Sequence, residues 1–208
     1  MNTHEWRHIL KTIIAKPNLH CRWLATLSHL ENCGARKIMN YQPYLGTDIE
    51  LLQHAAEESR HAYYFSKQIN KINPDSDNKW PLLAGHMGKR FLHRLDLGIA
   101  RLLQNTKIPE KTCLNNSSYL LTTYGIELRA EILYDLYEAE LQKSKSPVSI
   151  LSIIREEKHH LAQMEESINK IPGLAFVKPQ VLALEESLFK DFEILLKKSI
   201  GEHLAKSA

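Results

Sequence analysis

Apolar side chains recur at intervals of three, four and seven residues along most of the chain, which is the pattern of amphipathic α-helices. Polar segments and segments with proline or glycine interrupt this pattern and divide the chain into seven helical stretches. The predicted helices cover residues 4–15, 18–41, 47–70, 80–104, 115–143, 147–170 and 179–204. The hydrophobic pattern therefore predicts an all-α protein.

Residues that favour helix ends support several of these boundaries. Thr47 and Glu50 have the spacing of a capping box at the start of the second long helix. An asparagine or serine within 115–117 is expected to cap the helix that runs to about residue 143. Ser146 and Pro147 are an N-cap residue followed by proline at the first helical position, so we expect the next helix to begin there.

Three glutamates interrupt the apolar rows of these helices. Glu31, Glu58 and Glu157 each have apolar residues one or two turns away, on both sides, along the same helix face. An unpaired carboxylate in such a position is costly to bury, by several kcal/mol or more. A metal ion would offset that cost; for Glu31, Arg36 or a bound proton is the alternative.

Two of these glutamates belong to a short internal repeat. The segments AAEESRHA, at 55–62, and IREEKHHL, at 154–161, align without a gap. The aligned pairs are Glu57 with Glu156, Glu58 with Glu157, and His61 with His160. Each Glu-x-x-His places a carboxylate and an imidazole one turn apart on one helix face. Glu57 and Glu156 fall beside the apolar rows, so we expect both to be solvated.

A pair of oxygen-preferring metal ions needs several carboxylates, one imidazole per ion, and four helices that turn them inward. The residues that match are Glu31, Glu58, His61, Glu157 and His160. The sixth ligand is expected from the helix over 115–143, where Glu127 and Glu131 have comparable spacing. We favour Glu127, because Ala130 follows it by one turn as Gly34 follows Glu31. Glu131 is the alternative ligand.

Tyr124, Tyr134 and His54 are candidates for contacts with the ligands rather than for ligands. The two tyrosines share the helix of Glu127, and His54 precedes Glu58 by one turn. Tyrosines at helical spacing are more often packing residues with a hydrogen-bonded hydroxyl, and a histidine on a helix is more often solvated. Both interpretations remain open for each residue.

Composition and charge fit a globular helical protein. The 208 residues are enough for one domain, which we expect to span 1–208 with its core bundle at about 18–170. No apolar run approaches the roughly 20 residues that cross a bilayer, and no signal-peptide core is recognised. The net charge of +3 is spread among acids, which makes nucleic acid an unlikely partner. Cys21, Cys33 and Cys113 form no CxxC pair, so reduced thiols and a cytoplasmic location are expected.

Together these residues resemble the ferritin-like superfamily, in the branch of the rubrerythrins and di-iron oxygenases. The resemblance covers about residues 20–170 and rests on Glu31, Glu58-x-x-His61, Glu127-x-x-Ala130-x-x-x-Tyr134 and Glu157-x-x-His160. It implies a ferritin-like antiparallel four-helix bundle, with additional N-terminal, connecting and C-terminal helices. It also implies two iron ions, or Fe/Mn or Mn/Mn, that react with O2 or peroxide.

The expected function is that of a di-iron oxidase or oxygenase acting on a small-molecule or unidentified substrate, with an external electron donor or reductase. Because the chain lacks a CxxC pair, it has no rubredoxin-type iron of its own. We expect the substrate pocket among Leu27, Phe65, Tyr124 and Leu161. The alternatives are an iron-binding, ferroxidase-type protein, a metal-free helical scaffold, and a helical fold of the haem-oxygenase type. A homodimer is compatible with each.

Overall fold

The structure is a computed structural model that describes residues 1–41, 48–74, 80–106 and 111–206; of 111–115 only the backbone is described. In these ranges the chain forms seven α-helices and no strand, which confirms the all-α prediction. The helices are α1 (Thr3–Ile14), α2 (Pro17–Met39), α4 (Ile49–Ile72), α5 (Met87–Gln104), α6 (Lys111–Lys143), α7 (Leu151–Lys170) and α8 (Lys178–Lys206). A 3-10 helix, Leu174–Val177, precedes α8.

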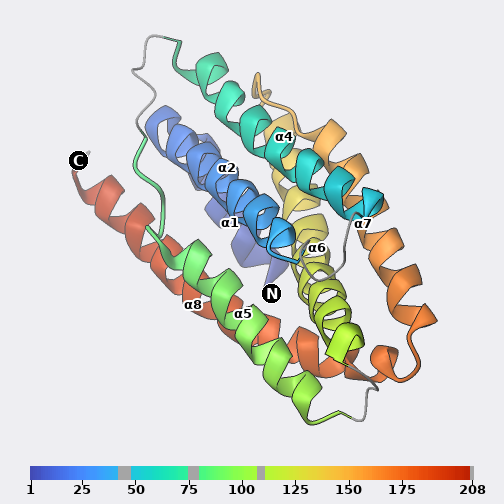
Figure 1. The fold of residues 1–208 in the computed structure, drawn as a ribbon. Helices are drawn as coiled ribbons and strands as arrows, with labels where there is room; N and C mark the ends of the chain where they lie inside the picture. Colours follow the sequence, from blue (N-terminus) through green and yellow to red (C-terminus); the bar gives the residue numbers. More distant parts are fainter. Residues whose placement is uncertain (42–47, 75–79, 107–110, 207–208) are drawn as a thin grey trace.

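The helices that carry the predicted ligands pack as two pairs. α2 lies along α4, and α6 lies along α7. The α2–α4 pair is antiparallel, since the Ser28 hydroxyl donates to the carbonyl of Ala62 and Gly34 lies against Glu58. In Figure 1, α5 and α8 run side by side along one flank, and α4 and α7 lie toward the opposite flank. α1 packs against α6 and α2.

Helix starts are where the structure differs most from the sequence prediction. α4 begins after Asp48, whose carboxylate accepts from the backbone N–H groups of Glu50 and Leu51 at 2.9 and 3.2 Å. Thr47, the expected capping residue, lies outside the described residues. α6 begins at Lys111, four residues before the expected cap region at 115–117.

Two further helices begin later than predicted because tertiary hydrogen bonds hold the preceding segments. α5 begins at Met87 rather than near residue 80, since the N–H of Leu83 donates to Thr26 Oγ1 at 2.8 Å. Ala84 and Gly85 then adopt positive φ angles of 59° and 55°, which no helix tolerates. α7 begins at Leu151 rather than at Pro147. The buried carboxylate of Glu138 accepts from the N–H of Ile150 at 2.7 Å and fixes that segment.

A layer of acids separates two apolar clusters. The first cluster includes Leu27, Phe65, Tyr134 and Ile153, and the second includes Ile38, Leu51, Leu120 and Met164. Each of the four helices α2, α4, α6 and α7 thus contributes to both clusters. The acids Glu31, Glu58, Glu127 and Glu157 lie in sequence between those contributions, one on each helix. The core therefore contains a polar layer at mid-height with apolar packing above and below it.

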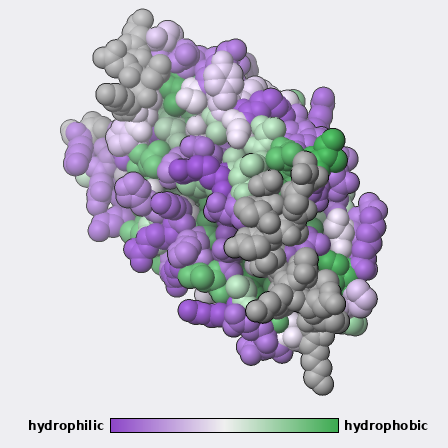
Figure 2. All heavy atoms as spheres, viewed as in Figure 1, coloured by the Kyte–Doolittle hydropathy of each residue, from purple (hydrophilic) through white to green (hydrophobic). Residues whose placement is uncertain are grey.

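None of the described helices is both long enough and apolar enough to cross a membrane. On the face in Figure 2, hydrophilic residues predominate and apolar residues lie among them in small groups.

Candidate metal centre

The polar layer brings all six predicted ligands together. Two groups of residues each place their ligand atoms within 4.8 Å of one another. The first group is Glu31, Glu58, His61 and Glu157, and the second is His54, Glu58, Glu127 and His160. All seven residues are buried, with no more than 8% of any of them exposed. Glu58 belongs to both groups and therefore lies where two adjacent cation sites would meet.

The structure distinguishes the two acids of α6 that the spacing left open. Glu127 is buried, and its Oε1 lies 3.1 Å from His54 Nε2. Glu131, one turn further along α6, is half-buried and belongs to neither group. On α2, Gly34, the small residue one turn after Glu31, lies directly against Glu58 Oε2, where an added Cβ would come to 3.4 Å.

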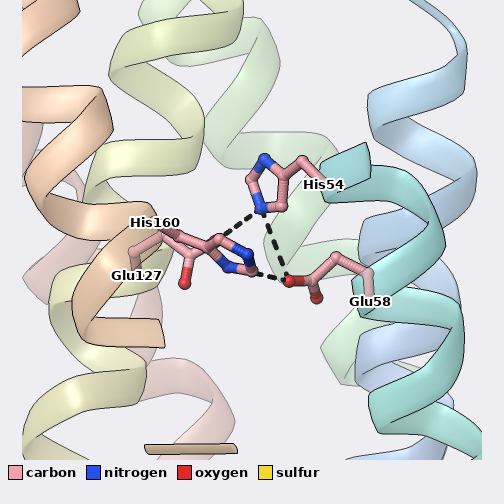
Figure 3. Close-up of side chains that lie close together, drawn as sticks. All are labelled: His54, Glu58, Glu127 and His160. Carbon is pink, nitrogen blue, oxygen red and sulfur yellow. Dashed lines mark hydrogen bonds and ion pairs between the residues drawn. The ribbon is translucent and has the colours of Figure 1, made fainter. Parts of the chain in front are cut away.

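His54 lies inside the cluster, and its ring nitrogen is as close to the other candidate ligand atoms as those atoms are to one another. Figure 3 shows its ring above His160, with 4.2 Å between the ring centroids, and its Nε2 directed toward Glu58 and Glu127. His54 Nε2 is 3.4 Å from Glu58 Oε1, and its Nδ1 is hydrogen-bonded to the Tyr119 hydroxyl at 3.0 Å. The bond to Tyr119 orients the ring, so His54 is a candidate seventh ligand. Its place one turn before Glu58 was the only signal in the sequence.

Glu57 and Glu156 form crossed hydrogen bonds with the histidines of the opposite repeat. His61 Nε2 lies 2.6 Å from Glu156 Oε2, and His160 Nε2 lies 2.7 Å from Glu57 Oε2. Both glutamates are half-buried and keep some contact with solvent, as expected, but their hydrogen bonds to the histidines were not predicted. A carboxylate on the outer nitrogen fixes the tautomer and the orientation of an imidazole and leaves the inner nitrogen free to bind a metal.

The inner atoms of the cluster lack partners. Glu58 Oε1, His61 Nδ1 and His160 Nδ1 are buried and make no hydrogen bond within the described part of the chain. His61 Nδ1 also lies 2.9 Å from Glu157 Oε1, outside hydrogen-bonding geometry. With Nε2 donating to Glu156, a neutral His61 directs a lone pair at a carboxylate. Something positive, either a proton or a metal ion, must lie between them.

The pKa values of Glu31, Glu127 and His160 are raised because this buried cluster holds several carboxylates and little positive charge. Burial raises the pKa of Glu31 well above its ordinary value, and the charges of Glu58 and Glu157 raise it further. Burial likewise raises the pKa of Glu127, again with Glu157 adding to the effect. Burial alone would lower the pKa of His160, but the neighbouring carboxylates of Glu157 and Glu57 raise it to about 9. Without a metal, the cluster therefore retains protons that bound cations would replace.

The donor set fits a pair of first-row divalent ions. It offers four carboxylates and three imidazoles and no thiolate, a combination that suits Fe or Mn better than a soft-metal site. The unpaired inner atoms and the crossed outer pairs are what such ions require of their ligands.

The predicted tyrosines have different surroundings. The Tyr134 hydroxyl donates to Glu31 Oε1, so Tyr134 directly supports a candidate ligand. Tyr124 is buried in the second apolar cluster, and Lys178 Nζ lies 4.7 Å from its ring centroid. The contacts of Tyr124 are therefore those of a packing residue.

A small cavity adjoins the carboxylates on the side away from the histidines. It measures about 90 Å³ and is lined by Glu31, Glu58, Glu127 and Glu157 together with Arg129 and mainly apolar residues of α2, α5, α6 and α8. Of the four residues expected around a pocket, only Leu27 lines it; Phe65, Tyr124 and Leu161 do not. The expectation erred because the cavity lies toward α5 and α8, whose packing the helix periodicity does not encode.

Comparisons with models of known protein families, with curated proteins and with solved structures found no match to this chain.

Proposed function

We propose that this protein is a non-haem di-metal oxidase or oxygenase, with two iron ions held between α2, α4, α6 and α7 in a ferritin-like arrangement. The observation that carries the proposal is the set of three unpaired, buried ligand atoms that converge in a layer of four carboxylates. The ligands would be Glu31, Glu58, His61, Glu127, Glu157 and His160, with His54 as a seventh.

Each part of the chain has a defined task in this proposal. The carboxylates neutralise the charge of the ions, and Glu58, which belongs to both groups, is the residue that two ions would share. Glu57 and Glu156 hold the imidazoles in the tautomer that binds metal, and Tyr134 orients Glu31. The apolar residues that make up most of the rest of the cavity lining would limit the water around the carboxylates.

When bound, the irons would supply the activation of O2 or peroxide for oxidation of an organic substrate. An external electron donor is required, since the chain contains no CxxC pair for a rubredoxin-type iron.

The experiment is anaerobic loading of the protein with Fe(II), followed by exposure to O2 with an electrode and an absorbance record. We expect about two irons per chain and rapid O2 uptake that depends on them. Glu131→Ala is the matched control, because Glu131 is an acid of α6 outside both groups. Absence of stoichiometric iron, or equal O2 uptake by the Glu58→Ala variant, would overturn the proposal.

A second candidate is a ferroxidase-type iron-binding protein without an organic substrate. A polar pocket of about 240 Å³ favours it, since Asp48 and Glu50 lie in the same pocket wall as His54 and could admit ions to the centre. Ferroxidase turnover without a co-substrate, together with a large shell-like oligomer in size-exclusion chromatography, would favour this function over the first.

A further inference from the structure

A second, polar groove lies between α2 and α5, outside the candidate metal centre. It measures about 360 Å³, and its lining includes Cys33, Arg36, Lys37, Lys89, Leu92 and His93. The two helices are parallel here, because Leu30 lies against Gly88 and, further along both, Lys37 Nζ pairs with Asp96 at 2.7 Å. The groove therefore follows the first half of α5.

Positive charge in this groove is largely uncompensated. Asp96, its one acid, is already engaged by Lys37 and accepts a hydrogen bond from the Tyr41 hydroxyl. Arg36 and Lys89 have no acidic partner within the ranges that the structure describes. Arg36 is held by its own helix: its Nε donates to the carbonyl of Asn32 at 3.2 Å and its Nη2 donates to Cys33 Sγ at 3.5 Å. Its Nη1 remains available to a ligand.

A further observation favours an anion at this position. The N-cap residue of α5 is His86, and its first turn holds Lys89 and no acid, the reverse of what a helix N-terminus prefers. A bound anion would relieve this unfavourable arrangement.

The groove borders the cavity beside the carboxylates. Leu92 lines both spaces, and Gly34, next to the groove residue Cys33, lines the cavity. The cavity volume of about 90 Å³ is below the roughly 150 Å³ in which benzene fits. Only a short apolar group could enter it, while a charged group on the same molecule would remain in the groove.

We propose that the groove binds the anionic group, a carboxylate or a phosphate, of a small amphiphilic substrate whose apolar end passes Leu92 toward the cavity. Arg36 and Lys89 contact the anion, and the carboxylate-lined cavity receives the part to be oxidised. This assignment rests on the proposed function for its meaning as a substrate site, but binding at the groove can be measured without turnover.

The test is a protein-detected NMR titration of the full chain with butanoate, butyl phosphate and 1-butanol. We expect one of the two anions to bind at least about tenfold more tightly than the alcohol, because a charge-assisted hydrogen bond is roughly twice as strong as a neutral one. The anion that binds more tightly shows whether the natural ligand carries a carboxylate or a phosphate. The double variant Arg36→Ala/Lys89→Ala should weaken its binding at least tenfold.

The matched control is Lys67→Ala/Lys71→Ala, which removes the same net charge from exposed positions of α4 and should leave the affinity unchanged. Equal binding of butanol and the anions, or equal losses in the two double variants, would overturn the proposal. Binding of a short RNA with no binding of either small anion would also overturn it, in favour of a macromolecular partner.

The connection to the cavity has its own test. Affinity should rise from acetate to butanoate in the natural protein, and Leu92→Phe, which fills the passage, should abolish that rise while inorganic phosphate binds as before. No dependence on chain length in the natural protein would contradict the connection. Metal content is measured on the same samples of the natural protein. If the natural protein takes up iron but binds neither anion, only the groove is refuted; if it binds an anion but takes up no iron, only the proposed function is refuted.

Discussion

Two regions of this protein bury acidic side chains, and they differ in whether the chain itself supplies a cation to compensate the negative charge. Between α6 and α8, Arg129 donates to both oxygens of the buried Glu185, at 2.9 and 2.5 Å, and also to Glu186. The N-terminal ammonium of Met1 pairs with Glu186 at 2.7 Å. Each of these acids therefore has a cation from the chain itself.

The layer between α2, α4, α6 and α7 has no such partner. None of its four carboxylates is paired with a lysine or arginine in the described ranges, and the inner nitrogens of His61 and His160 make no hydrogen bond there. Burial of an acid is thus a weak sign of function. Burial of several acids without an internal cation is the sign of a site that takes its positive charge from outside.

The two regions should differ most in their effect on bound metal when one acid is removed from each. Glu58→Ala or Glu157→Ala should reduce bound metal from about two ions per chain to none, measured by inductively coupled plasma mass spectrometry. Glu185→Gln should retain the metal, because its partner is Arg129. Full metal content in both Glu58→Ala and Glu157→Ala would show that the ligands are wrongly assigned.

Removing the cation of the α6–α8 pair should mainly affect stability. Arg129→Ala leaves Glu185 buried and unpaired, and the loss of such a partner costs about 3–5 kcal/mol. Urea unfolding measures this, with Arg94→Ala as the control: Arg94 pairs with the exposed Asp191, and a surface pair contributes about 1 kcal/mol or less. Equal effects of the two substitutions would contradict the distinction between the regions.

Buried histidines provide a third contrast. The carboxylates raise the pKa of His160, whereas His20, whose Nε2 contacts only the Tyr137 hydroxyl at 2.5 Å, has its pKa lowered to about 4 by burial. In the unfolded chain His20 binds a proton near pH 6.5, whereas in the native state it stays neutral down to about pH 4. Stability that is present above pH 6.5 is therefore lost as the pH falls toward 4. The expected loss is about 3 kcal/mol.

The measurement is the urea midpoint of the protein from pH 7 to pH 4.5, compared with that of His20→Gln, which keeps a polar partner for Tyr137. The variant should lose less stability over this interval. Parallel pH profiles for the two proteins would mean that His20 is not buried in its neutral form.

The smallest effect concerns the crossed pairs. Glu57→Gln and Glu156→Gln should each lower metal affinity by about 10- to 100-fold while stoichiometry at saturation is kept, because they orient imidazoles without binding the ions. Competition with a metal chelator measures the affinity. Glu166→Gln on the exposed face of α7 is the control. An unchanged affinity in both variants would remove the orienting role.

The helix pattern predicted which acids are buried together, because a carboxylate within an apolar row must point inward. Glu31, Glu58 and Glu157 were found in this way, and a small residue one turn later singled out Glu127. The starts of α5 and α7 were missed because Thr26 and Glu138 bind backbone groups far away in sequence. No local pattern contains such a partner.

The cross-helix hydrogen bonds of Glu57 and Glu156, and the place of His54 among the candidate ligands, were missed for a related reason. Periodicity states which side of a helix a residue occupies, but not what lies across from it. Each of these side chains acts on a residue of another helix: Glu57 on His160, Glu156 on His61, and His54 on Glu127. The repeated Glu-Glu pair was visible in the sequence, but its meaning depends on how α4 faces α7.

The most direct test of the polar layer as a metal centre is a crystal structure of the iron-loaded protein with anomalous maps recorded on both sides of the Fe and Mn absorption edges. The account predicts two adjacent peaks among Glu31, Glu58, Glu127 and Glu157, with His61 and His160 directed at them. Peaks confined to the protein surface, or an empty layer in protein saturated with iron, would contradict it.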